Sequence, residues 1–431
     1  MKMLTPHQIR LLVLRLQLRA RQNRNAMALL LPAYMQLQQR RRRQRQFWVR
    51  PWITRRVQFG AYDTLMGELE RESRGDFANY LRMDPAMFHE LVQRLTPRLT
   101  KALTRLRRPL EPGLKLAITL RHFASGDSYH SLSFAFRVPH NTISKFVPEV
   151  CDAITAEYQG EVVILPTTPD EWRAVAKLFG HKWNFHNAIG ALDGKHIAIR
   201  APGKTGTTYH NYKGFFSIIL LGMVDADYKF IWADVGANGS TSDCAVFNDS
   251  TLKAALDANT LGLPQAEPLP SDDRPMPYFV IGDDAFPLTT YMMKPFSKRQ
   301  MDDDERIFNY RLSRARRIVE NAFGILANRF QLLLTTMMQE PLTVQKIVVS
   351  CICLHNLMRM RYPQLQNNAL DRDDANMNLI PGAWRDGRVL REVDAVRGGN
   401  RASREAKKQR LYLKNYYNNA VGSVPWQQNM I

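Results

Sequence analysis

The first stretch of the chain lacks acidic residues altogether. From Met1 to Tyr62 there is no aspartate and no glutamate, whereas fourteen lysines and arginines lie between Lys2 and Arg56. The whole chain has 60 Lys+Arg against 40 Asp+Glu, a formal net charge of +20. A block of like charge repels itself, and such blocks are usually solvated tails or arms that bind polyanions. The composition therefore indicates a nucleic-acid partner.

Cysteines and uninterrupted apolar runs are also scarce. The early leucines, Leu11 to Leu18, are interrupted by Arg15, which excludes a signal-peptide core or a membrane span in this stretch. The cysteines show no framework spacing, so a reducing compartment is the simpler interpretation. We therefore expect a soluble, intracellular protein with no membrane partner. The four cysteines are Cys151, Cys244, Cys351 and Cys353.

Residues 1–60 are predicted to form a basic N-terminal arm. Its densest run of charge is Arg40, Arg41, Arg42 and Arg43. One interpretation is nuclear import or contact with phosphates, and the other is a soluble, partly helical tail. Phosphate contacts would add affinity without sequence preference, and that affinity would fall steeply with salt.

Residues 61–160 are predicted to be a helical region with a helix-turn-helix at about 128–150. A short helix over Tyr129–Phe136, a tight turn and a second helix from His140 suit that motif. The first residues of the second helix face base edges in the major groove in such motifs. Scaffolding without DNA contact is the alternative. The expected DNA contacts are Asn141, Thr142 and Lys145, with Ile143 and Phe146 packing inward.

Residues 165–360 change to buried strands and amphipathic helices. The predicted order is three strands, a helix, a fourth strand and a further helix. Residues 361–431 are predicted to be a polar, partly disordered tail with one helix. The expected strands are 187–199, 216–224, 229–235 and 278–283, and the expected helices are 248–259, 311–330 and 342–360.

Three acids stand at particular places in this order. Asp193 lies in the first strand, Asp283 ends the fourth, and Glu320 lies on the following helix. Asp283 and Glu320 are 37 positions apart (320 minus 283). Two divalent ions such as Mg²⁺ or Mn²⁺, held by carboxylates, assist phosphoryl transfer. The order predicts an α/β, ribonuclease-H-like domain with a mixed sheet, in which these acids converge on two metal ions.

Each acid also has a structural interpretation. Asp283 could be a turn residue, Asp193 could simply follow a buried strand, and Glu320 could pair with Arg316 or Arg317. Two further residues are candidates for supporting roles. Asp243 is either an accessory acid or a helix cap, and Lys213 is a candidate for contact with substrate phosphate.

The sequence around these acids resembles the conserved blocks of PIF/Harbinger transposases. The likeness runs roughly from Phe47 to Leu357, and Ser128–Val147 is similar to that family's helix-turn-helix. Phe286 departs from the pattern, because a tyrosine is usual there. The matching blocks are Ala191–His196, Asn211–Gly214, Val235–Asp243, Gly282–Leu288, Val319–Phe330 and Leu354–Asn356.

The resemblance implies a DDE catalytic domain of ribonuclease-H-like fold, with Asp193, Asp283 and Glu320 as catalytic, metal-binding residues. It implies cleavage and transfer of transposon ends, at terminal inverted repeats, in the nucleus. It also implies a Myb/SANT-like partner protein, and we expect a homo-oligomer on DNA. The alternative is a domesticated DNA-binding or interaction protein that keeps the fold without cutting.

Deleting residues 1–46 is expected to weaken DNA binding and to flatten its dependence on salt. Each phosphate that the arm neutralises contributes about 0.9 to the slope of log K against log salt, so the truncated protein should show a shallower slope. Binding to one duplex at several salt concentrations measures this slope. An unchanged slope would show that the arm serves import or partner proteins instead.

Overall fold

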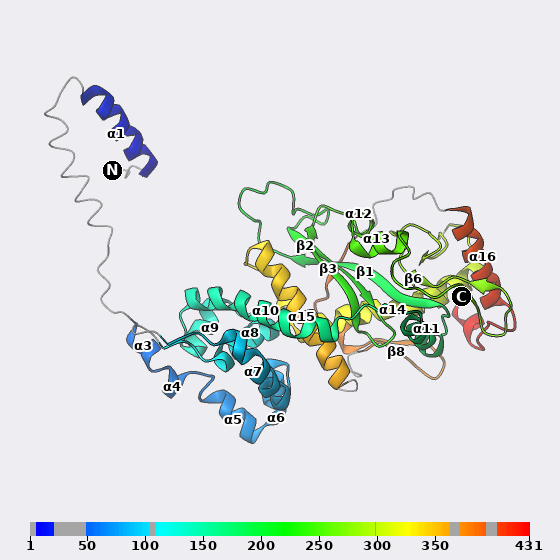
Figure 1. Cartoon of the computed structure of the whole chain (residues 1–431), viewed down its shortest axis with the longest axis horizontal. Coiled ribbons are helices and arrows are strands. Elements are labelled where there is room, and N and C mark those ends of the chain that lie inside the picture. Colours follow the sequence, from blue (N-terminus) through cyan, green and yellow to red (C-terminus); the bar gives the residue numbers. More distant parts are fainter. Residues whose placement is uncertain (1–5, 21–48, 104–107, 298, 363–369, 394–402) are drawn as a thin grey trace. The chain divides into compact units, whose positions relative to one another are not determined.

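The computed structural model describes residues 6–20, 49–103, 108–297, 299–362, 370–393 and 403–431. The chain divides into two compact units, Met1–Arg55 and Arg56–Ile431. Within its described residues, the first unit contains helices α1 (Pro6–Ala20) and α3 (Pro51–Thr54). The second unit contains the helical region and the sheet (Figure 1).

The helical region begins the second unit, and its helices start at well-defined caps. Asp84 caps α7 by accepting a hydrogen bond from the Ala86 amide, and Pro85 occupies the first turn. One face of α7 is buried, as its three-to-four apolar spacing predicts. The helices are α4 (Arg56–Phe59), α5 (Leu65–Glu72), α6 (Arg74–Leu81), α7 (Pro85–Leu99), α8 (Pro112–Ser125), α9 (Tyr129–Phe136) and α10 (His140–Val162).

A short turn joins α9 to α10. Ser128 caps α9, and Arg137 adopts a left-handed conformation (φ 52°) that ends it. Ile143 and Phe146 on α10 are buried, as predicted. Asn141 and Lys145 are exposed on the same helix, and Thr142 is half-buried.

The main sheet is mixed, with the strand order β3-β2-β1-β6-β7. Strands β1, β2 and β3 pair antiparallel, whereas β6 joins the other edge of β1 in parallel and β7 follows β6 in parallel. The strands are β1 (Ala188–Ala198), β2 (Ser217–Val224), β3 (Phe230–Asn238), β6 (Phe279–Ile281) and β7 (Met292–Met293), and β4 (Glu267–Pro268) pairs with β5 (Pro275–Met276) in a separate small sheet.

Helices cover both faces of this sheet, so its central strands are continuously apolar. One core joins a face of the sheet to α14, α15 and the helical region, and a second core lies between the opposite face and α11, α12 and α13 (Figure 1). The Thr168 and Glu171 capping box starts α11. These helices are α11 (Pro169–Trp183), α12 (Asp243–Asn248), α13 (Thr251–Asp257), α14 (Asp303–Arg329) and α15 (Pro341–Arg361), with a 3-10 turn η1 (Gln331–Leu334).

Several elements differ from the sequence-based expectation. The helix expected over 248–259 forms over Thr251–Asp257, and a separate short helix, Asp243–Asn248, precedes it, because Ser242 and Ser250 each cap a start. The helix that carries Glu320 begins at Asp303, eight positions before the expected Arg311 (311 minus 303). Its start is fixed by Asp302, which accepts a hydrogen bond from the Glu305 amide.

Arginines on α14 are buried, not solvated as the predicted basic amphipathic helix implies. Arg311 is 1% exposed and donates to Gln427 Oε1 at 2.7 Å and to the Asn184 carbonyl at 2.5 Å. Arg314 donates to Asp373 Oδ2 at 2.8 Å. These bonds tie α14 to segments far away in the sequence.

The C-terminal residues pack onto the sheet domain where the sequence predicts a loose tail. Tyr417 on α16 is fully buried against Phe185, with ring centroids 5.1 Å apart. Trp384 donates to Asn321 Oδ1 at 2.8 Å and lies against Gly324 of α14. A few apolar residues, widely spaced among polar ones, pack this segment against the domain. Such isolated residues are not evident from composition alone. The elements are β8 (Arg372–Asp373), β9 (Leu379–Ile380), η3 (Ala383–Asp386), β10 (Arg391–Glu392), α16 (Arg404–Asn418) and η4 (Gln427–Met430).

Helix α15 is a core helix. Among the described residues it is the one helix long and apolar enough to cross a membrane, and 67% of its apolar window is buried inside the fold. Cys351 and Cys353 are buried free thiols, and His355 contacts the Tyr228 carbonyl through Nε2 at 2.8 Å. Asn356 donates to the Val162 and Phe230 carbonyls at 2.7 Å and accepts from the Phe230 amide at 2.9 Å.

Replacing Asn356 with alanine should destabilise the protein strongly. The change leaves buried backbone groups of Phe230 and Val162 without partners, and each such group costs about 1–3 kcal/mol. We expect the free energy of unfolding in urea to fall by at least about 3 kcal/mol. The exposed Asn378, which donates to Asp374 Oδ2, is the control, and Asn378→Ala should change it by no more than about 0.5 kcal/mol. Equal losses in the two variants would contradict this role for Asn356.

Candidate active site

The pairing of β1 with β6 brings two of the predicted acids together. Ala191 on β1 pairs with Ile281 on β6, and both strands run in the same direction. Asp193 and Asp283 each lie two residues beyond this pair, so they reach the same level at the end of β6. Asp193 is 4% exposed.

The charges of these acids affect each other. Burial, together with the negative charge of Asp193, raises the pKa of Asp283 to about 6. The Ala285 amide donates to Asp283 Oδ1 at 2.8 Å and Arg316 lies nearby, and both partly offset the rise. The neighbouring Asp284 points away, is largely exposed and pairs with Lys294 at 3.2 Å, as its position next to Asp283 predicts.

Two basic side chains lie among the acids. Lys195 Nζ is 2.8 Å from Asp193 Oδ2, and Arg316 is 2.7 Å from Glu320. Burial lowers the pKa of Arg316, but the charges of Glu320, Asp193 and Asp283 outweigh that effect and raise it overall. The same balance raises the pKa of Lys195, through Asp193, Glu392 and Glu320. The structure therefore brings all three predicted acids into one electrostatic cluster.

A fourth acid, Asp243, lies against β1 from α12. An added Cβ on Gly194 would come within 2.0 Å of Asp243 Oδ1, so the strand needs a glycine at this point. Successive strand residues point to opposite faces, so Asp243 approaches from the face opposite the Asp193 side chain. Ser242 caps α12, which removes the capping interpretation of Asp243.

The environment of Asp243 is unfavourable for a charged carboxylate. Its side chain is 1% exposed, and neither oxygen has a hydrogen-bond partner within the part of the chain that the structure describes. Burial raises its pKa well above the ordinary range, and the charges of Asp193 and Asp283 raise it further. The candidate accessory acid is therefore part of the cluster.

Glu320 forms an ion pair with Arg316 in the same helix, as its alternative, structural interpretation predicts. Searching the described ranges, we find no group of three or more His, Cys, Asp or Glu side chains arranged to hold a metal ion. Lys195 and Arg316 contact the acids instead. The chain's own cations thus offset part of the negative charge of the cluster.

The other predicted site residues lie in different places. Lys213 is exposed and donates to the Glu392 carbonyl at 2.8 Å. Asn141, Thr142 and Lys145 lie at the start of α10, apart from the acids in sequence and on another element. The predicted DNA contacts Arg40, Arg41, Arg42 and Arg43 lie outside the described residues.

Sequence reasoning missed two residues that reach the cluster from the C-terminal segment. Arg385 lies 3.8 Å from Glu320 and is anchored by Asp371 at 2.6 Å. Glu392 on β10 pairs with Lys195 across the sheet and lies 3.5 Å from its Nζ. No local signal marks either residue, because each lies in a polar stretch more than 60 positions after Glu320 (385 minus 320 is 65).

Replacing Asp243 with asparagine should stabilise the protein increasingly as the pH rises. The folded protein holds the Asp243 proton more tightly than the unfolded chain does. Wild type therefore loses stability as the pH rises above about 4, whereas the variant does not. The difference in unfolding free energy should grow at up to about 1.4 kcal/mol per pH unit, without divalent ions, in urea titrations.

Asp257 in the adjacent α13 is the control, because hydrogen bonds from Lys253 and Tyr291 lower its pKa. Asp257→Asn should therefore show the opposite sign, losing stability relative to wild type as the pH rises through the acid range. A pH-independent effect of Asp243→Asn would contradict the buried, unpaired carboxylate.

Comparisons with known proteins agree with this site. Residues 192–356 match the family described as DDE superfamily endonuclease. The chain is 24% identical over 270 residues to "Putative nuclease HARBI1" of Homo sapiens, covering 62% of this chain and 72% of that protein. It is 23% identical over 254 residues to "Protein ALP1-like" of Arabidopsis thaliana, covering 58% and 61%. No solved structure matches the chain.

The matched region contains the whole acidic cluster of Asp193, Asp243, Asp283 and Glu320. It also contains the blocks around the acids, apart from Ala191, and the resemblance is confirmed for that region, whereas Ser128–Val147 lies outside it. The chain therefore carries a DDE superfamily endonuclease domain over residues 192–356 and is homologous to the HARBI1 and ALP1-like proteins.

Proposed function

We propose that this chain is a divalent-metal-dependent DNA endonuclease that cuts and transfers transposon DNA ends. The observation that carries the proposal is the convergence of Asp193, Asp283 and Glu320 around one half-buried arginine, Arg316. The endonuclease domain supports hydrolysis of phosphodiesters as the reaction class. Because separate strands and a helix supply the acids, the cluster depends on the whole fold.

The sheet supports a ribonuclease-H-like assignment. Three antiparallel strands are followed, in chain order, by α12 and α13, the small β4/β5 sheet, the parallel strands β6 and β7, and α14. Asp193 lies in the middle of β1, Asp283 follows β6, and Glu320 lies on α14 over the sheet. The acids thus hold the positions expected from the sequence.

The donor chemistry of the cluster fits hard divalent cations. Carboxylate oxygens are the ligands that Mg²⁺ and Mn²⁺ prefer, and Asp193, Asp283 and Glu320 supply three carboxylates whose charges act together on Arg316. Asp193, Asp283 and Glu320 would hold the ions, and Asp243 would act as an accessory acid through its charge. When bound, such ions activate the attacking oxygen and stabilise the leaving oxygen of an in-line displacement.

The chain's own cations have a separate role in this proposal. Lys195 and Arg316 partly offset the charges of Asp193 and Glu320, and both cations would also contact the scissile phosphate. Arg316 suits that contact because a guanidinium can donate two parallel hydrogen bonds to phosphate. Exposed Lys213 is assigned to phosphate further along the strand.

DNA binding is assigned to two other parts of the chain. The short turn between α9 and α10, with Asn141 and Lys145 exposed, supports a helix-turn-helix that reads DNA through Asn141, Thr142 and Lys145. The basic arm would add affinity that depends on salt. By resemblance we further propose action on terminal inverted repeats in the nucleus, as a homo-oligomer and with a Myb/SANT-like partner protein.

One observation favours a second candidate, a domesticated DNA-binding or interaction protein that does not cut. Asp193 and Glu320 are both engaged in ion pairs with Lys195 and Arg316, the arrangement expected of acids with a structural role. A cleavage assay separates the two candidates.

Wild-type protein should cut terminal-repeat DNA in Mg²⁺ or Mn²⁺, and Asp193→Asn, Asp283→Asn and Glu320→Gln should each reduce the rate at least about 100-fold. Residues that merely support a metal ligand cost about 10- to 100-fold, so removal of a ligand itself should cost more. The rate of strand cleavage on a gel measures this.

Asp284→Asn is the matched control, because Asp284 adjoins Asp283 but points to solvent and pairs with Lys294. It should cut like wild type. Wild type that binds the DNA without cutting it, or full activity in Asp193→Asn, would favour the non-cutting protein.

A further inference from the structure

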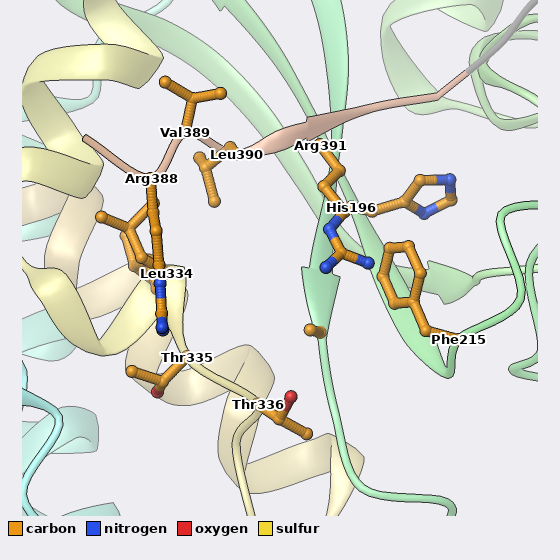
Figure 2. A pocket seen from close by; sticks show the side chains of 11 residues that line it. His196, Phe215, Leu334, Thr335, Thr336, Arg388, Val389, Leu390 and Arg391 are labelled. Carbon is orange, nitrogen blue, oxygen red and sulfur yellow. The ribbon is translucent and has the colours of Figure 1, made fainter. Parts of the chain in front are cut away.

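A basic cavity opens beside the acidic cluster, at the end of β1. Its volume is about 510 Å³, within the range of about 300–1,000 Å³ typical of small-molecule sites. Three separate parts of the described chain form its wall: the end of β1 and the loop before β2, the segment after α14, and the C-terminal segment before β10 (Figure 2). The polar and aromatic residues among its lining are His196, Phe215, Thr335, Thr336, Arg388 and Arg391.

The charge of this cavity is one-sided. Two arginines and a histidine line it, and no acidic residue does. Figure 2 shows the Arg388 and Arg391 side chains extending in the same direction on either side of the open space, with Thr335 and Thr336 beyond them. Arg388 is exposed and makes no ion pair within the described residues. An anionic ligand would therefore find donors on both sides.

An aromatic platform accompanies the charge. The Arg391 guanidinium lies over the Phe215 ring, 4.2 Å from its centroid, and His196 meets the same ring edge-on at 5.7 Å. A guanidinium stacked on a ring offers its other face to a further planar group, as in single-stranded nucleic-acid sites. Apolar Leu334 and Leu390 complete the wall. Cationic and stacking groups together fit a nucleotide better than a bare anion.

The cavity adjoins the predicted point of cleavage. Arg391 on β10 pairs directly with His196 on β1, and His196 follows Asp193 by three positions (196 minus 193). Three strand residues span about 10 Å, and a stacked DNA strand rises about 3.4 Å per nucleotide. His196 and Asp193 point to opposite faces of β1, so a DNA strand joining the cavity to a phosphate at Asp193 would pass around the sheet edge and need several nucleotides.

A second cavity continues from the first toward the helical region. Its volume is about 670 Å³, and it shares Thr335 and Thr336 with the first. Its far wall includes His130 of α9 and Ser144 of α10. The two cavities therefore adjoin each other at Thr335 and Thr336.

We propose that the first cavity binds one unpaired deoxynucleotide of the substrate strand, several positions from the scissile phosphate. Arg388 contacts its phosphate, and its base stacks on the Arg391 face turned away from Phe215. A base inside a duplex is stacked and paired on all sides, so only an unpaired or extruded base can enter. The assignment rests on the proposed nuclease function, because that function places the cleaved strand at Asp193.

The test compares a blunt duplex with the same duplex ending in a short single-stranded overhang that carries 2-aminopurine. Full-length protein without divalent ions, which prevents cutting, should bind the overhang more tightly and quench the aminopurine by stacking. Arg391→Ala should abolish the quenching and weaken overhang binding about 5- to 100-fold, the effect of losing one stacked base. Arg388→Ala should weaken overhang binding with less effect on quenching.

Two further variants keep the result specific. Arg391→Lys retains the charge but not the planar face, so it should recover part of the affinity and none of the quenching. Arg372→Ala removes an exposed arginine of β8 outside the cavity and should change neither signal. Equal binding of blunt and overhanging DNA by wild type, or equal effects of Arg372→Ala and Arg391→Ala, would overturn the proposal.

Cleavage by wild type, measured separately, distinguishes the two proposals. If wild type cuts DNA without preferring an overhang, the proposal of a nucleotide site is wrong and the proposal of a nuclease stands. If wild type does not cut but prefers an overhang in a way that depends on Arg391, the nucleotide site is supported and the nuclease proposal is contradicted. Faster duplex cleavage by Arg388→Ala and Arg391→Ala, with unchanged overhang binding, would instead identify residues 388–391 as a cover over the acids and overturn the assignment.

Discussion

Buried negative charge at the edge of β1 is the constraint on which the candidate site depends. Water would screen carboxylates from each other, but Asp193 and Asp243 are nearly inaccessible, and the charge of Asp193 raises the pKa of both Asp243 and Asp283. The fold holds the acids in place despite this repulsion, and Lys195 and Arg316 only partly offset it. A site that carries unbalanced charge in its resting state is suited to bind cations.

Helix α14 carries both the arginines that anchor it to the fold and the residues that it directs at the site. Arg311 and Arg314 bind main-chain and side-chain oxygens of distant segments, which fixes the rotation of the helix about its axis. Residues four apart lie on one helical face, so Arg316 and Glu320 are then directed together at the sheet. A basic helix on the surface could not position Glu320 so firmly, because solvated arginines carry no directional bonds to the rest of the fold.

Features of the site that depend on local sequence patterns could be predicted, whereas features that depend on contacts between distant segments could not. The strands with Asp193 and Asp283, and the helix with Glu320, are marked by local apolar patterns, and those elements form as predicted. The place of Asp243 could not be derived in that way, since it depends on a close approach to Gly194 between elements far apart in sequence. The prediction of a loose C-terminal tail was the most extensive error. The anchors of that segment, such as Trp384 and Tyr417, are isolated apolar residues with no periodicity to reveal them.

The role of that segment follows from the geometry of the sheet. Strand β6 pairs with β1 only as far as Ile281, so the remainder of β1 on that side would be left as an open edge beside the acids. Strand β10 covers the edge at Lys195 and His196, and in doing so it brings Glu392 and Arg391 to the site. The pairing of β10 with β1 therefore both covers the open edge and adds charged residues to the site. The family match ends at residue 356, before any of this segment begins. The charge around the acids is consequently a property of the longer chain, and it can differ between relatives whose matched domains are alike.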